Sequence, residues 1–217
     1  MRVARSTIQV QLKAHQSNYF PERHSVAGYA NMKSKIKRPA ALILLLATFS
    51  STVCYGNEGD EQAHFFTEIY SNLCLINLTN LDLTREKIIG APKLPPEKAA
   101  LFIGDHPGDA WPVTSNLGEF VLSLSNNNEL CAVHAKRLNT VTAEKPFRII
   151  VGTAPSPLVS IKLKDEIKQT QPNGEVRTIS YDWSLPGATR TMLFTLSIAP
   201  SAAAQLQALV TTAILRR

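Results

Sequence analysis

Residues 119–135 read Glu119-Phe120-Val121-Leu122-Ser123-Leu124-Ser125-Asn126-Asn127-Asn128-Glu129-Leu130-Cys131-Ala132-Val133-His134-Ala135. Phe120, Leu122 and Leu124 recur with a period of two, which is typical of a strand with one buried face. The three asparagines favour a tight turn, and the apolar run 130–135 returns as a second strand. The stretch therefore predicts an antiparallel hairpin, the first part of a sheet.

More strands are expected on both sides of this hairpin. One opens at Trp111-Pro112-Val113, and one covers 159–164, where Val159, Ile161 and Leu163 alternate with polar residues. Two others carry inward rows, which are Ile179, Tyr181 and Trp183 in one, and Met192, Phe194, Leu196 and Ile198 in the other. Pro172-Asn173-Gly174 and Pro186-Gly187 predict the turns between these strands.

Helical signals lie before, within and after the strand region. Residues 63–74 place Phe66, Ile69, Tyr70 and Leu73 on one helical face. We expect one helical turn at 84–89, and a helix from Pro95-Pro96 to Gly104. Residues 140–150 are expected to be helical at their start, with Pro146 opposing a long helix. A terminal helix over Ala202 to Leu215, capped by Ser201, completes the prediction.

These elements predict an α+β domain with two layers. Its antiparallel sheet should have about five or six strands, with helices covering one side. The strand order is not determined by the sequence.

The charge is concentrated at the N-terminal end of the chain. Of the formal net charge of +6, residues 1–31 carry +3, residues 32–56 carry +4 and the remainder carries −1. The composition is 44% apolar and 18% charged, which excludes a disordered, collagen-like or polytopic membrane protein.

A partly basic sheet face is expected from four side chains: Lys162, Lys164, Lys168 and Arg177. Acidic side chains are interleaved with them: Asp165, Glu166 and Glu175. This mixture is typical of a solvated face and gives no continuous stripe for binding phosphates, so we expect no nucleic-acid partner.

Residues 32–56 have the three parts of a secretory signal peptide. Four bases in 33–38 precede an apolar run, Ala40 to Ala47, which is far shorter than the roughly 20 residues that span a bilayer. Cleavage is expected before Asn57, with Tyr55 as an alternative, which leaves 57–217 as a single exported domain in the periplasm. Residues 1–31 then form an untranslated or disordered extension, and translation would begin at Met32. Intact mass of the precursor would reveal those residues if they are present.

Acylation of Cys54 is an alternative that would anchor the protein to the envelope, although Val53 departs from the usual small residue before a lipidated cysteine. Removing or acylating Cys54 leaves Cys74 and Cys131, whose spacing does not fit a zinc site. In an oxidising compartment they predict a disulfide, which would stabilise the fold by about 4 kcal/mol. Two buried free thiols are the alternative.

The strongest candidate site is Asp105-His106-Pro107-Gly108-Asp109-Ala110-Trp111, where two carboxylates, an imidazole and an indole gather in one turn. Asp105, His106, Asp109 and Trp111 would serve as binding contacts, because loops held on a rigid sheet often carry recognition. The structural interpretation is stronger: the Pro-Gly pair makes the turn, and Trp111 fills the core. His134 is expected to be a packed or surface side chain. No nucleophile, metal or phosphate-binding motif is present, so the sequence indicates no catalytic residue, cofactor or metal.

The chain resembles a family of small, functionally uncharacterised exported proteins and lipoproteins of proteobacteria. The resemblance runs from about Phe65 to Leu215 and is carried by three segments: 108–111, 118–122 and 130–137. It implies a Gram-negative envelope protein and brings no catalytic residues.

We expect a non-enzymatic periplasmic interaction module whose partner is another envelope protein. It would be an accessory of an envelope or secretion assembly, or an inhibitor or immunity protein. Two alternatives stay open, an envelope hydrolase using His106 with Asp105 or Asp109, and a small-ligand binding protein with a deep apolar pocket. The oligomeric state is left open.

Overall fold

The computed structural model describes residues 57–104, 106–127 and 129–216. The predicted extension, the signal peptide and Cys54 lie outside these residues. Among the helices that are described, none is long and apolar enough to cross a membrane.

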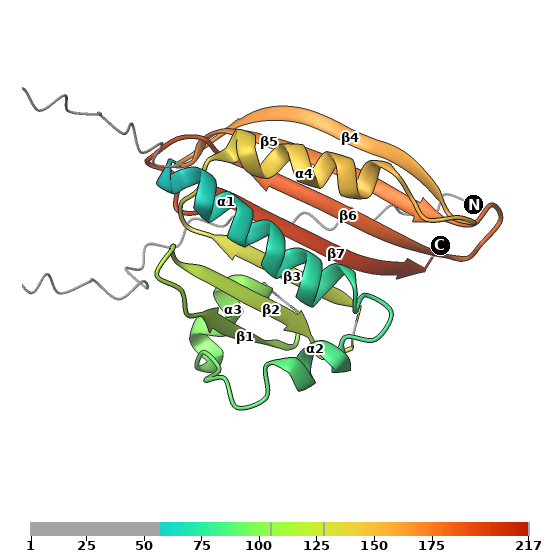
Figure 1. The fold of residues 1–217 in the computed structure, drawn as a ribbon, viewed down its shortest axis with the longest axis horizontal. Coiled ribbons are helices and arrows are strands. Elements are labelled where there is room, and N and C mark those ends of the chain that lie inside the picture. Colours follow the sequence, from blue (N-terminus) through green and yellow to red (C-terminus); the bar gives the residue numbers. More distant parts are fainter. Residues whose placement is uncertain (1–56, 105, 128, 217) are drawn as a thin grey trace, which may run out of the picture.

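Seven strands form one antiparallel sheet in the order β1-β2-β3-β7-β6-β5-β4 (Figure 1). Two meanders, β1 to β3 and β4 to β6, are joined because the C-terminal strand β7 lies between β3 and β6. The strands are β1 Gly108–Val113, β2 Phe120–Ser125, β3 Leu130–Ala135, β4 Val159–Thr170, β5 Gly174–Ser184, β6 Arg190–Ile198 and β7 Ala208–Arg216.

The helices lie on both faces of the sheet. Four α-helices are described: α1 Glu58–Ile69, α2 Asp82–Lys87, α3 Pro96–Ile103 and α4 Thr140–Gly152, and α1 continues into the π-helix η1 Tyr70–Leu75. Helices α1 and α4 lie side by side across one face, while α3 lies behind β1 and β2 (Figure 1). The α+β class is confirmed, but the helices do not cover one side only.

The main core lies between the sheet and the pair α1 and α4. The predicted rows on β2, β5 and β6 all point into it, as their strand registers require. Phe120, Leu122 and Leu124 are at most 2% exposed. On the other face, Val121 packs with Ala99 and Ile103 of α3 in a smaller cluster.

The predicted C-terminal helix is wrong, because residues 208–216 form strand β7. The apolar residues Leu206, Leu209, Val210 and Ala213 fit a helical stripe, but the sheet buries both sides of β7, so apolar residues occur on both of its faces. Leu209 and Val210 therefore point in opposite directions. This strand raises the count from the expected five or six to seven.

Helix α4 runs through Pro146, which the sequence prediction did not expect. A proline in a helix interior lacks one hydrogen-bond donor and costs about 3 kcal/mol. Ala143, Phe147 and Val151 of the same helix are buried against the sheet. Their packing offsets the loss.

The predicted turns are confirmed. The loop containing Pro172 and Asn173 links β4 to β5, and Gly174 has a φ of +73°. Gly187 has a φ of +79° between β5 and β6, in the region that favours glycine.

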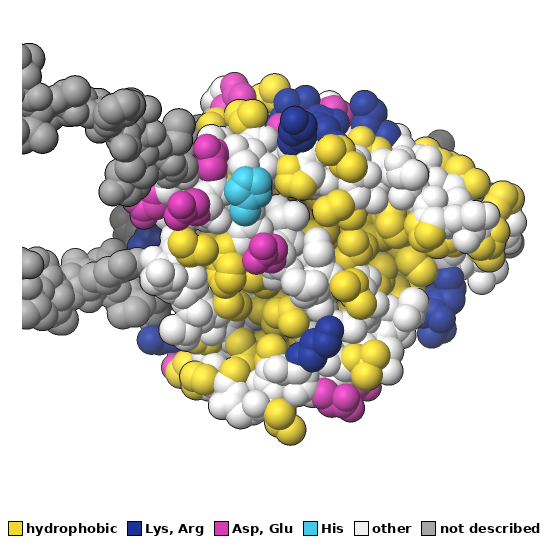
Figure 2. Space-filling model, in the orientation of Figure 1, with side chains coloured by type: hydrophobic (Ala, Val, Ile, Leu, Met, Phe, Trp, Pro, Cys, Tyr) yellow, Lys and Arg dark blue, Asp and Glu magenta, His cyan; other side chains and the backbone are white. Residues whose placement is uncertain are grey.

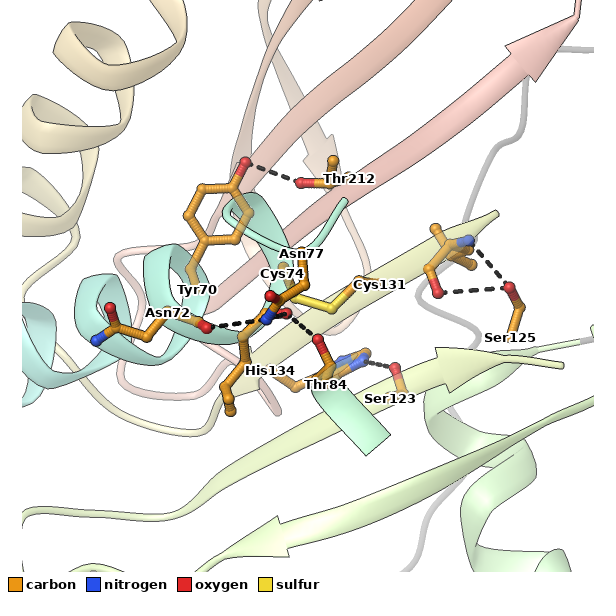
Figure 3. The surroundings of a disulfide bond; sticks show 12 residues. Tyr70, Asn72, Cys74, Asn77, Thr84, Ser123, Ser125, Cys131, His134 and Thr212 are labelled. Atoms are coloured by element: carbon orange, nitrogen blue, oxygen red, sulfur yellow. Dashed lines mark hydrogen bonds between the residues drawn. A yellow bond between two sulfur atoms is a disulfide. The ribbon is translucent and has the colours of Figure 1, made fainter. Parts of the chain in front are cut away.

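The predicted disulfide between Cys74 and Cys131 is present and joins η1 to β3 (Figure 3). Both cysteines are completely buried. Beside them, the Thr212 hydroxyl of β7 donates to the Tyr70 hydroxyl at 2.9 Å. Burial raises the pKa of Tyr70, and its hydrogen bond to Thr212 only partly opposes this effect. The disulfide therefore pins the first helical segment over the middle of the sheet.

Candidate functional site

The turn singled out in the sequence does not form a converging site in the described residues. His106 is exposed, whereas Trp111 is 4% exposed and belongs to the main core. The Lys93 ammonium lies 2.8 Å from an Asp109 carboxylate oxygen and 5.4 Å from the centre of the Trp111 ring. Lys93 thus bridges two side chains that share a face of β1. Trp111 fills the core as the structural interpretation expected, but Gly108 and Asp109 belong to strand β1 and not to a turn. Asp105 lies outside the described residues.

A buried Ser-His pair lies behind the same sheet region, and the sequence reasoning did not find it. The Ser123 hydroxyl is 3.1 Å from His134 Nε2 and donates to the Phe102 carbonyl at 3.3 Å. The Phe102 ring meets the imidazole edge to face, with ring centres 5.1 Å apart. The alternation could have placed Ser123 and His134 on the face opposite Leu122, but the partner helix α3 could not have been foreseen.

His134 is held in its neutral form. Burial, the larger effect, lowers its pKa to about 4, and the nearby Phe102 backbone acts in the opposite direction. His134 Nδ1 has no hydrogen-bond partner among the residues that the structure describes. A catalytic base needs an orienting group and access to substrate, and His134 is only 4% exposed. The arrangement anchors α3 to the sheet and places no reactive group at the surface.

The surface feature that stands out is the edge strand β4. It is 12 residues long and pairs with β5 on one side, and no strand within the described residues pairs with its other edge. Half-exposed apolar side chains occur along it: Val159 (47%), Ile161 (49%), Leu163 (56%) and Ile167 (55%). Edge strands present unpaired backbone groups that can bind another strand.

A groove lies along the flank of α4 beside Arg177 of β5, on the face of the sheet that α4 covers. Its open volume is about 520 Å³, and its lining residues are Val141, Glu144, Lys145, Arg148, Ile149 and Arg177. Two of these residues are apolar and highly exposed, Val141 at 75% and Ile149 at 65%. Figure 2 shows apolar side chains interspersed with basic and acidic ones over α4 and β4, at the top of the view.

Ion pairs fix the floor of this groove. Arg148 lies 2.7 Å from Glu144 and 2.8 Å from Asp165, and Arg177 lies 3.0 Å from Asp165. Hydrogen bonds from Arg148 and then Arg177 lower the pKa of Asp165. Burial acts to lower the pKa of Arg148, but its bonds to Glu144 and Asp165 outweigh burial and raise it. These ion pairs hold α4 against β4 and β5, and they pair the charges of Arg148, Arg177, Glu144 and Asp165 with one another.

The basic side chains expected to share one partly basic sheet face lie on two faces, each together with an acidic side chain. Glu166 lies between two lysines on one face, 2.8 Å from Lys164 and 2.9 Å from Lys168. Arg177 lies on the other face with Asp165. A register shift between Lys162 and Lys164 separates the two halves of the strand and interrupts its alternation.

No group of three acidic, histidine or cysteine side chains placed to bind a metal occurs within 57–104, 106–127 and 129–216. A second hollow, between Val176, Ser197 and Leu209, has a volume of about 10 Å³, which is room for about one water molecule. Neither this hollow nor the open groove is the deep pocket that a small-ligand binding protein would need.

Comparisons with known proteins add little to this geometry. No family model and no curated protein matches the chain. Among solved structures, the chain is similar to the BH2602 protein of Bacillus halodurans, determined with CoA, at 10% identity and a TM-score of 0.15. The match covers 76% of this chain and 98% of that one, and at this TM-score it supports no conclusion about fold or ligand. The resemblance to exported envelope proteins therefore stays a prediction.

Proposed function

We propose that the protein is a non-enzymatic interaction module of the bacterial periplasm that binds a protein partner along β4 and the adjoining flank of α4. The observation that carries the proposal is the edge of β4 that no described strand covers, with four half-exposed apolar side chains along the strand. Of these, Ile167 shares the face on which Arg177 lines the groove. A protein partner that adds a strand to this edge would satisfy its backbone groups and cover these side chains.

The compartment is supported by independent features. The Cys74–Cys131 disulfide fits an oxidising environment. The basic and apolar pattern of residues 33–47 is typical of an export signal. An envelope accessory and an inhibitor or immunity protein both act through such a contact surface.

Charges on β4 favour selective binding. Lysines on an edge strand discourage random pairing with other edges, and the register shift at Lys162 further restricts which strands fit. A partner must therefore match both the apolar side chains and the charge order.

The test is partner capture from periplasmic extract, using the full chain and two matched variants. Ile167→Asp places a charge on β4, while Ile89→Asp makes the same change at a side chain that is 86% exposed in the segment after α2. We expect Ile167→Asp to reduce partner retention at least tenfold and Ile89→Asp to leave it unchanged. Equal retention by all three proteins would contradict the proposal.

A further inference from the structure

We infer that β4 pairs with β4 of a second copy of this chain, antiparallel and centred on Ile167, so that the two sheets become one continuous sheet. This inference rests on the proposed function, because it names the partner of the same surface. It follows from the geometry of the strand, the order of its charges and the groove above it.

The regular part of β4 provides the pairing segment. Between the register shift and the turn to β5, Lys164 to Thr170 pair one by one with 180 to 174. In the part of the chain that the structure describes, no strand lies on the other side of this segment. Seven residues in regular conformation match the usual length of a natural strand pair.

The charges in this segment are self-complementary about Ile167. With Ile167 opposite itself, Glu166 of each copy faces Lys168 of the other, which gives two opposite-charge pairs across the junction. Centring on Glu166 would place that carboxylate against itself and Lys164 against Lys168. Centring on Asp165 or on Lys168 also sets a like charge against itself. A shift of the register by one residue would put opposed side chains on different faces, which an antiparallel pair does not allow.

The groove gives the pairing a helix-side contact. Ile167 pairs with Arg177 in the sheet and so shares the face on which Arg177 lines the groove. Helix α4 runs antiparallel to β4 above this face, because the Ser160 hydroxyl donates to the Val151 carbonyl and Arg148 pairs with Asp165.

In the paired state, the two copies of α4 face each other across the junction. The exposed Val141 and Ile149 on their flanks then lie over the paired Ile167 side chains. Ile167 at the centre of the strand and the apolar flank of α4 are covered in one step, whereas Val159, Ile161 and Leu163 lie outside the paired segment. Burying apolar surface is the main favourable contribution to association.

Charge reversal provides the experiment. The experiment uses purified full-chain protein. Glu166→Lys alone places lysine opposite lysine at both 166–168 contacts across the junction, and Lys168→Glu alone places glutamate opposite glutamate there. We expect the wild type to sediment as a dimer and each single variant to dimerise at least tenfold more weakly. A mixture of the two single variants should form a heterodimer, because each lysine at position 166 or 168 again faces a glutamate. The double variant should regain the homodimer.

Folding of the variants is controlled by their circular dichroism. The ion pairs of Glu166 with Lys164 and Lys168 are on the surface, where such pairs contribute little to stability, so all variants should fold. The control substitution Glu97→Lys lies in the first turn of α3, away from β4, and should leave the dimer intact.

The outcomes separate this inference from the proposed function. A wild-type monomer at about 100 μM, a concentration at which weak biological dimers form, overturns the inference. If that monomer still captures another protein in a manner sensitive to Ile167→Asp, the interaction surface stands. A dimer that neither the charge variants nor Ile167→Asp affects overturns the inference, and places self-association elsewhere on the chain.

Discussion

The neutral His134 makes the stability of the domain depend on pH in a specific window. Its pKa is about 4 in the folded protein, while the ordinary value in an unfolded chain is 6.5. Because the folded pKa is the lower one, the unfolded chain binds the proton more tightly. The free energy of unfolding is therefore fully retained above pH 6.5 and falls as the pH drops toward 4.

The size of the effect follows from the two pKa values. Between about pH 7 and about pH 5 the loss is about 2 kcal/mol, and it reaches about 3 kcal/mol near pH 4. Asp165 does not interfere, because its pKa lies below the ordinary carboxyl value of 3.8, so the stability that its ion pairs provide is lost only at lower pH. The interval from pH 7 to 5 isolates the histidine.

The assay is urea unfolding at both pH values, followed by the fluorescence of the buried Trp111 and Trp183. His134→Gln keeps a polar group near Nε2 and removes the titration, so its free energy of unfolding should change by less than about 0.5 kcal/mol between the two pH values. His106→Gln makes the same change at an exposed histidine and should behave like the wild type. If the free energy of unfolding of His134→Gln changed between the two pH values as much as that of the wild type, the reasoning would be refuted.

Three further predictions concern the contacts that hold the layers together. Replacing Cys74 and Cys131 with Ala should lower the free energy of unfolding by about 4 kcal/mol, because the disulfide joins residues 57 positions apart. Urea unfolding with and without reductant measures the loss, and an unchanged urea midpoint would contradict the prediction. Trp183→Phe removes an indole N–H that donates to the Val151 carbonyl of α4 at 2.7 Å, so the free energy of unfolding should fall by about 1 to 2 kcal/mol. An unaltered urea midpoint would show that this hydrogen bond does not stabilise the fold. Thr212→Val removes the 2.9 Å hydrogen bond to the buried Tyr70 hydroxyl on η1, so the free energy of unfolding should fall by about 1 kcal/mol in the same assay. If residues 208–216 were helical, no loss would be expected.

The proposed surface was only partly visible in the sequence. The alternation of Val159, Ile161 and Leu163 correctly predicts a strand, and the interleaved charges correctly predict solvent exposure. Nothing in that pattern says that β4 is the edge of the sheet or that α4 lies beside it. These facts depend on strand order, which follows from pairings between residues far apart in the chain.

The buried Ser-His pair illustrates the same limit. Alternation assigns Ser123 and His134 to the face away from Leu122, and the sequence does not decide whether that face is packed or exposed to solvent. Only the docking of α3 makes that face dry, and the dry environment then lowers the pKa of His134. A pKa shift of this kind cannot be deduced from neighbouring residues in the sequence.

The sequence by itself determined the elements whose pattern has a single explanation: the amphipathic helix 63–74, the hairpin 120–135, the glycine turns and the cysteine pair. Each depends on local periodicity, on backbone preference or on residue count, which do not change with the surroundings. The tertiary structure decided the identity of residues 208–216 and the exposure of β4. Residues 208–216 form a strand between β3 and β6 and are buried on both faces. An apolar run of this kind is compatible with a helix and with a central strand until the sheet is assembled.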